Sequence, residues 1–386
     1  MAADRVAVRI GGELSAEASV GAFDNRLPPR GPLGGAQNGD DWDDWDPTRA
    51  RLGYTGRMGA LPWMGPGSRG GIDLPDPALT RQRGTGAEPL SPLALALIAR
   101  AETEDYLNVT YNVREPGFAE VYDALIAPQW SEPFGRLLLS AFLTLPRESG
   151  WQGLDVACGT GYPTLELAHY IGQDCDLAGI DIWEEAIALA TRKARDAWLR
   201  NVTFLAADVL ESGLPEGSFD TITCNLGLTS FADRSGALGA MWRLLRQRGH
   251  LLLTTPLQSA MREFLDIYYL TLRDLKLGDY QRAFAQQIAL RPTVAETRRL
   301  MERAGFQIAR EVTDTFMLRF PSPLAFLRSP LVQTTYMLWW RSIIPDLTIR
   351  RLVFNEVERR LEARAQVNGG ELAMTVPMLC LVGVRM

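Results

Sequence analysis

Short apolar runs alternate with amphipathic stretches between residues 151 and 256. The apolar runs are WQGLDVAC, CDLAGIDI, NVTFLAAD, FDTITCNLGL and GHLLLTTP, and most are separated by helix-length stretches of period 3.6. Buried strands that alternate with helices form parallel sheets with helices on both faces. The pattern therefore predicts an α/β core over 151–256.

Helical periodicity dominates the flanking segments. Residues 93–150 hold three such stretches, interpreted as a helical lead-in or cap, and 257–320 continues with cap helices, one of them ending at Gly305, and a sixth strand. The apolar run at 371–386 predicts a final strand antiparallel to the sixth. The segment between them, 321–370, is too long for a hairpin loop. We interpret it as a hydrophobic lid insertion that forms a module of its own.

Residues 1–92 differ in composition from the rest of the chain. They contain 16 of the 35 glycines and 10 of the 23 prolines, which is typical of a low-complexity, disordered tail. Within this tail, the motif DDWDDWDP at 40–47 and the rings of Tyr54 and Trp63 allow two interpretations. They form either a docking motif for a protein partner or a solvated linker with exposed rings.

Charge and cysteine content exclude several classes of function. The net charge is -6 and no basic stripe is present, so nucleic acid is not expected as a partner. The four cysteines are widely separated and show neither CxxC spacing nor a nearby set of cysteines and histidines, so neither a metal site nor a disulfide framework is expected. The first residues lack a secretory apolar region and no apolar run reaches the ~20 residues that span a bilayer. A cytoplasmic protein is expected.

A glycine-rich turn follows the first predicted strand. In LDVACGTGYPTLELA, residues 154–168, an acidic residue ends the strand, two glycines form the turn, and a helix is predicted from Pro163. Glycine lets a ligand approach the backbone closely because no Cβ intervenes. The dinucleotide-binding pattern GxGxxG or GxGxxA is broken by Thr164. DVACGTG instead resembles the first motif of class I S-adenosylmethionine-dependent methyltransferases, an acidic residue followed by GxGxG, with Ala157 at the first glycine position.

This resemblance implies a Rossmann-like seven-stranded methyltransferase sheet, S-adenosylmethionine as cofactor, and roles for residues at successive strand ends. Asp181 is expected to bind the ribose hydroxyls, Asp208 the adenine amino group, and the Val209 amide a ring nitrogen. Asn225 is expected beside the methionine part of the cofactor, and Asp155 is expected to organise the site of its ammonium group. The expected cofactor-binding residues are Asp155, Ala157, Cys158, Gly159, Gly161, Asp181, Ile182, Asp208, Val209 and Asn225.

Alternative roles stay open for these polar residues. Asp155 could simply bond amides of the loop, Asn225 could form a cap or turn, and Asp181 and Asp208 could be ordinary loop carboxylates.

No catalytic residue is identified from the sequence. The two histidines, His169 and His250, are expected to be structural, because one lies inside a helix and the other at the amino end of a strand. The candidates for a base or a substrate contact are Tyr111, Tyr122 and Tyr268. Aromatic residues at helical positions also pack in cores, which is the alternative for each of them.

The insertion is rich in large apolar side chains, among them Phe326, Trp339 and Trp340. One interpretation is a substrate pocket for an acyl chain, prenyl tail or polyketide ring, with Arg328 or Arg341 facing an acidic group. The second is packing of the lid onto the sheet, and the third is contact with a membrane surface or a second subunit.

The resulting hypothesis is methyl transfer from S-adenosylmethionine to an oxygen, nitrogen or carbon atom of a hydrophobic small molecule, as in quinone-biosynthesis and natural-product methyltransferases. One alternative is O-methylation of a carrier-bound acyl carboxylate. Another is a non-catalytic cofactor-binding scaffold that holds a partner through its aromatic tail and lid.

Overall fold

The computed structural model describes residues 89–172, 175–367 and 369–386. The predicted tail, including the aromatic motif at 40–47, falls almost wholly outside these residues.

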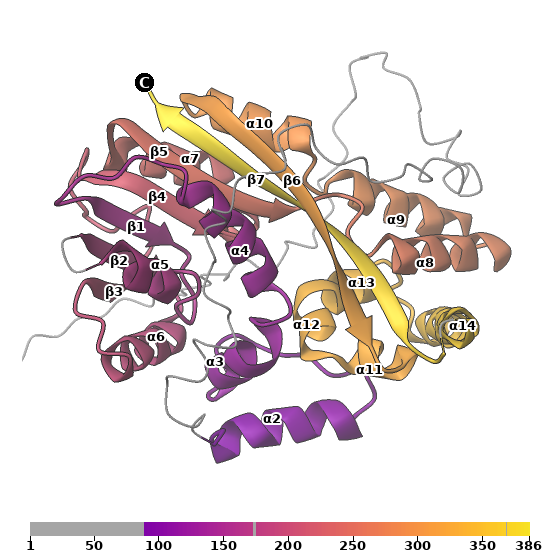
Figure 1. Ribbon diagram of the computed structural model, residues 1–386. Helices are drawn as coiled ribbons and strands as arrows, with labels where there is room; N and C mark the ends of the chain where they lie inside the picture. The colour runs from indigo at the N-terminus through magenta and orange to yellow at the C-terminus, as the bar shows by residue number, and fades with distance from the viewer. Residues whose placement is uncertain (1–88, 173–174, 368) are drawn as a thin grey trace, which may run out of the picture.

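A seven-stranded sheet forms the centre of the molecule (Figure 1). Its strands are β1 (Gln152–Val156), β2 (Asp176–Asp181), β3 (Val202–Ala206), β4 (Phe219–Asn225), β5 (Leu245–Pro256), β6 (Phe306–Phe320) and β7 (Leu372–Arg385). The spatial order is β3-β2-β1-β4-β5-β7-β6. Strands β1 to β5 run parallel, whereas β7 is antiparallel to both of its neighbours. The predicted seven-stranded sheet and the antiparallel final strand are confirmed.

Helices precede the sheet, connect its strands and fill the insertion. They are α2 (Pro92–Thr103), α3 (Phe118–Val121), η2 (Tyr122–Ile126), α4 (Ser131–Phe142), α5 (Thr164–Ile171), α6 (Glu184–Asp196), η3 (Gly227–Ser230), α7 (Arg234–Leu244), α8 (Arg262–Asp274), α9 (Gly278–Ala289), α10 (Val294–Arg303), α11 (Pro323–Arg328), α12 (Pro330–Val332), η4 (Gln333–Met337), α13 (Leu338–Ser342) and α14 (Leu347–Gln366). The helix after β1 begins at Thr164, with Pro163 as its N-cap, one residue later than expected.

Both faces of the central strands β1, β4 and β5 are buried, as their apolar runs predict, whereas the edge strands β3 and β6 are largely exposed. Leu251 and Leu253 of β5 pack in one cluster with residues of α7 and α10, whereas Leu252 packs in a second cluster with residues of α4 and α5. Successive strand residues point to opposite faces, so a strand covered on both sides needs a continuous apolar run.

The insertion shares its core with the lead-in helices. Phe326 and Trp340 of the insertion belong to the same hydrophobic cluster as Phe118 and Phe134 of the lead-in. Strands β6 and β7 extend past the other strands toward α11–α14 (Figure 1). Segments far apart in sequence therefore close over one end of the sheet. No helix in the described ranges is long and apolar enough to cross a bilayer.

Candidate active site

The expected cofactor residues gather where β1, β2 and β3 end. The pairing brings Asp155 beside Gly179 and Asp181 beside Ala206. The Ala207 amide donates to the Asp181 carbonyl over 2.9 Å. In parallel strands the carboxyl ends share one edge, the edge at which open α/β sheets bind ligands.

Asp155 is fully buried at the end of β1. Its carboxylate accepts hydrogen bonds from the hydroxyls of Thr164 in α5 (2.5 Å) and Thr223 in β4 (2.7 Å). Burial raises its pKa to about 6, against the opposing effect of the two hydroxyls. The alternative role, bonding to loop amides, is not what these two bonds show, because both donors are side-chain hydroxyls. Asp155 thus ties the turn to the neighbouring strand and has no exposed surface to offer a ligand.

The turn itself leaves space beside its backbone. Gly159 has a φ of +52°, and a Cβ built there would meet no atom within 4 Å. A Cβ at Gly161 would instead lie 3.0 Å from Leu165 and 3.1 Å from Ala190. Ala157 takes a φ of 59°, so the residue at the first glycine position keeps the left-handed conformation. An open, side-chain-free surface at Gly159 fits a cofactor that lies against the backbone.

Asp181 closes this surface from the end of β2. Its carboxylate accepts from the Gly159 amide (2.8 Å) and the Trp183 amide (2.9 Å). Burial raises its pKa, and these amides partly offset that effect. The next side chain, Ile182, is apolar and 59% exposed, which suits the flat face of an adenine ring.

The remaining expected cofactor residues offer a ligand different groups, a carboxylate in Asp208 and backbone groups in Val209 and Cys158. Asp208 accepts a hydrogen bond from the Leu210 amide (2.9 Å), while Val209 is buried, so only its backbone could serve a ligand. The Cys158 side chain is also buried, and burial raises the pKa of its thiol. Cys158 can contribute only its backbone as well.

Asn225 connects the end of β4 to the lead-in helices. Its amide nitrogen donates to the Ser131 carbonyl (3.0 Å), and its amide oxygen accepts from the Thr254 hydroxyl (2.7 Å). The Ser131 hydroxyl in turn lies 2.7 Å from the Tyr122 hydroxyl. Asn225 is therefore neither a helix cap nor a free side chain. Ser131 could not be singled out from the sequence, because a serine at the start of a helix is ordinary.

Of the three tyrosine candidates, Tyr122 alone lies beside the expected cofactor residues. Its ring packs edge-on against the ring of Trp183, with ring centres 5.6 Å apart. Burial raises the pKa of its phenol, and the negative charges of Asp181 and Asp123 add to this effect. The phenol stays protonated near neutral pH, so it can donate a hydrogen bond but is a poor general base.

The other two tyrosines lie elsewhere. Tyr268 is fully buried in α8 and donates to the Trp340 carbonyl (3.1 Å). Tyr111 packs on Phe118, and its hydroxyl is 3.4 Å from the Leu97 carbonyl. Their placement supports the packing alternative. His250 lies on β5 opposite Thr221, toward the amino ends of the strands, and burial lowers its pKa.

The insertion uses most of its large side chains for packing. Trp340 is fully buried and stacks on Phe264 with ring centres 3.7 Å apart. Arg341 donates to the Leu107 carbonyl and Arg328 to the Glu102 carbonyl, both over 2.6 Å. Both arginines thus bind the backbone of the lead-in segment, and a contact of either with an acidic substrate group stays a prediction.

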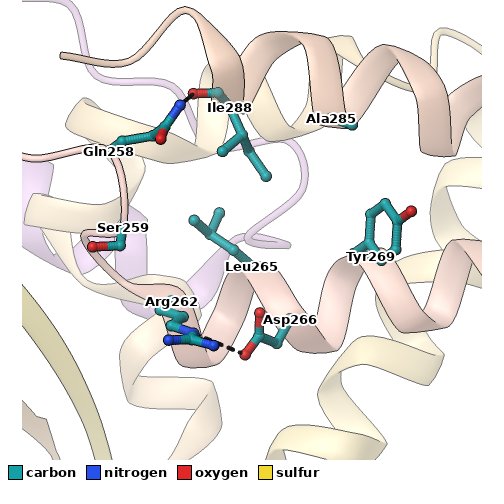
Figure 2. A pocket seen from close by; sticks show the side chains of 8 residues that line it. All are labelled: Gln258, Ser259, Arg262, Leu265, Asp266, Tyr269, Ala285 and Ile288. Atoms are coloured by element: carbon teal, nitrogen blue, oxygen red, sulfur yellow. Dashed lines mark hydrogen bonds and ion pairs between the residues drawn. The ribbon is translucent and has the colours of Figure 1, made fainter. Parts of the chain in front are cut away.

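A pocket of about 170 Å³ lies between α8 and α9 (Figure 2). Leu265, Ala285 and Ile288 line its apolar part, and the Arg262–Asp266 pair lies at one side. The pocket contains none of the expected cofactor residues. It adjoins the segment that follows β5, through Gln258, whose side chain donates to the Ile288 carbonyl (3.1 Å).

Comparison with known proteins agrees with this geometry. A family model described as a methyltransferase domain matches residues 147–305. Nocamycin O-methyltransferase of Saccharothrix syringae is 29% identical over 284 residues, which cover 69% of this chain and 95% of that protein. The ubiquinone/menaquinone biosynthesis C-methyltransferase UbiE of Psychromonas ingrahamii is 30% identical over 169 residues, which cover 41% of this chain and 67% of that protein. The UbiE protein of Teredinibacter turnerae is 31% identical over 167 residues, with the same coverage of both chains. The chain belongs to the class I S-adenosylmethionine-dependent methyltransferases, and S-adenosylmethionine is its cofactor.

Proposed function

We propose that this enzyme methylates an oxygen, nitrogen or carbon atom of a hydrophobic small molecule at the carboxyl ends of β1 and β4. The observation that carries the proposal is the polar cluster of Tyr122, Ser131 and Asn225 beside the open turn at Gly159. This cluster joins the cofactor side of the site to the helices that cover it.

On the cofactor side, the proposal assigns binding to backbone and carboxylate groups. Asp181 binds the ribose hydroxyls, Asp208 and the Val209 amide bind the adenine edge, and Ile182 covers one face of the ring. Gly159 leaves room for the amino-acid part. Asp155 holds the turn in place through Thr164 and Thr223 and does not itself touch the cofactor.

On the substrate side, aromatic rings lie next to the polar cluster. Trp130 precedes Ser131. The centre of its ring lies 5.2 Å from the ring centre of Phe134 and 5.8 Å from that of Tyr336. Rings of this kind bind apolar molecules and exclude water. This supports a hydrophobic substrate, in line with the substrate class expected from the sequence.

The proposed chemistry relies on orientation. When bound, S-adenosylmethionine supplies a methyl group on a cationic sulfur. Holding the accepting atom in line with that methyl group can contribute roughly 7–11 kcal/mol. Tyr122 contributes a hydrogen-bond donor, and the aromatic rings keep water from the accepting atom. The relatives include enzymes named for O- and for C-methylation, so the proposal covers an oxygen, nitrogen or carbon atom as the methyl acceptor. The cytoplasmic location stays a prediction.

The test follows the methyl group. The purified chain is incubated with methyl-labelled S-adenosylmethionine and a cell extract of the source organism, and the label is then separated into organic-extractable, protein and nucleic-acid fractions. The proposal expects label in an organic-extractable molecule. Label found only in protein or nucleic acid would contradict it, and label on an acyl carrier would favour the carrier-bound alternative.

A further inference from the structure

The Arg291 guanidinium, just after α9, has no acidic partner in the part of the chain that the structure describes. Its Nη1 donates to the carbonyls of Gln258 (2.9 Å) and Ala260 (3.0 Å). Its guanidinium carbon lies 5.3 Å and 5.7 Å from the ring centres of Tyr336 and Trp339. Burial lowers its pKa, the Tyr336 hydroxyl partly offsets that effect, and no carboxylate of the described chain does so. Arginine nevertheless keeps its charge in proteins, so a poorly hydrated positive charge remains here.

Two buried hydrogen-bond donors lie near this cation, with Tyr336 in contact with it and Trp340 stacked on Tyr336. The Tyr336 side chain is 4% exposed, and apart from the neighbouring Arg291 its hydroxyl has no partner among residues 89–172, 175–367 and 369–386. Trp340 stacks on Tyr336 with ring centres 5.4 Å apart, and its Nε1 is also buried and unpartnered in that part of the chain. Buried polar groups are normally hydrogen-bonded. Two neighbouring donors without an acceptor, the Tyr336 hydroxyl and Trp340 Nε1, beside a buried cation point to a ligand that brings acceptor atoms.

The position of these donors connects them to the active site. Gln258 and Ala260 directly follow Pro256, where β5 ends at the carboxyl edge of the sheet. The ring of Tyr336 packs edge-on against that of Trp130, with ring centres 5.8 Å apart. The next residue, Ser131, accepts the hydrogen bond from Asn225. A chain of side-chain contacts therefore runs from Arg291 through Tyr336 and Trp130 to the polar cluster at which the methyl group is proposed to be transferred.

We propose that Arg291 and Tyr336 form a subsite for the carboxylate of an apolar acid. The proposal rests on the proposed function and specifies its substrate class. A guanidinium presents paired N–H groups that match the two oxygens of a carboxylate, and the phenol adds a third donor. The carboxylate anchors one end of the substrate, and the accepting atom lies toward Asn225. The rival role for Arg291 is purely structural, as a clamp on the carbonyls of 258 and 260.

The test measures binding of an acid and its neutral analogue. Decanoate and decanamide are titrated by calorimetry into the full chain saturated with S-adenosylhomocysteine. We expect the wild type to bind decanoate at least tenfold more tightly than decanamide. Arg291→Met should abolish this preference. Arg298→Met is the matched control, because that guanidinium pairs with Glu311 at the surface, and it should keep the preference.

Tyr336→Phe provides a second variant that keeps Arg291 and the ring. It should reduce the preference for decanoate several-fold without lowering the melting temperature by more than a few degrees. If Arg291→Met fails to fold, as judged by circular dichroism, Arg291→Lys replaces it and should weaken the preference because it loses the paired geometry.

The subsite is overturned if the wild type binds acid and amide equally, if it binds neither, or if the preference survives in the Arg291 variant. None of these results bears on methyl transfer itself, because the labelling experiment measures that separately. Conversely, an absence of methylated small molecule with an intact acid preference would overturn the proposed function and leave an acid-binding site.

Discussion

Asp181 is the residue on which cofactor affinity should depend most. The two charge-assisted hydrogen bonds proposed from Asp181 to ribose should contribute about 1.5–3 kcal/mol each, so Asp181→Ala should weaken S-adenosylmethionine binding by at least tenfold in calorimetry. Asp233→Ala is the matched control, because Asp233 also accepts a backbone N–H, that of Gly236 (2.8 Å), but at the start of α7. An unchanged affinity in Asp181→Ala would remove Asp181 from the site.

Gly159 tests whether the open space beside the turn is a binding surface. Gly159 and Gly213 both have positive φ and no atom within 4 Å of a built Cβ, so alanine at either position should cost about 1–2 kcal/mol of folding free energy. We expect only Gly159→Ala to weaken cofactor binding, by about tenfold or more, because its methyl group fills the proposed cradle. Equal affinities in the two variants would show that the cofactor does not lie against Gly159.

Asp155 should make stability depend on pH in an unusual direction. Its folded-state pKa is raised to about 6 from an ordinary value of 3.8, so the protonated form is favoured by folding. That contribution is complete below about pH 4 and is lost as the pH rises through about 6. Relative to Asp155→Asn, the wild type should therefore lose about 2–3 kcal/mol between pH 4 and 7 in urea unfolding. A stability difference that does not change with pH would contradict this burial of the carboxylate.

At the scale of elements, the insertion gains its stability from stacked rings. Trp340 is fully buried between Phe264 and Tyr336, so Trp340→Ala should lower the free energy of unfolding by about 3–5 kcal/mol. Trp198 is 80% exposed, and Trp198→Ala should change it by no more than about 0.5 kcal/mol. Thermal unfolding of both variants checks the contrast. Similar melting temperatures would mean that Trp340 is not part of the core.

The elements also show where sequence reasoning succeeds and where it stops. Strands β1 to β5 were predicted from their short apolar runs, and the roles of the motif residues are those that the methyltransferase resemblance implies for residues at strand ends. Ser131 and Arg291 could not be found in this way. Their roles depend on contacts with Asn225, 94 positions away, and with Tyr336, in a separate element. Periodicity describes which face of a helix is buried, but not which distant side chain it meets.

At the scale of the whole molecule, the tail should be dispensable. A chain starting at Pro89 keeps Ser91, which caps α2 through the Ala94 amide and donates its own amide to Glu120 (2.7 Å). Because 1–88 has the composition of a non-globular segment, the shortened chain should melt within about 5 °C of the full chain and bind S-adenosylmethionine equally well. A larger drop in melting temperature would show that the tail packs on the enzyme.

The domain division predicted at 321–370 illustrates a limit at this scale. The sequence shows the segment's length and its apolar composition. It also predicts that the segment lies between two paired strands. That its helices share one core with residues of α2, α3 and α4 depends on the shape of the surfaces that meet. A hydrophobic segment can bury itself alone or against others, and composition does not distinguish the two.

The position of β7 also affects how the chain acquires its structure as it is made. This strand follows every other element in the chain, yet it lies between β5 and β6 and pairs with both. Chains fold from the amino end during synthesis, so β5 and β6 emerge from the ribosome with a strand-wide gap between them. Until residues 372–385 arrive, both strands expose unpaired backbone that can recruit the wrong partner. The enzyme should therefore be most vulnerable to aggregation, and most in need of chaperones, in the interval when the insertion has emerged but β7 has not.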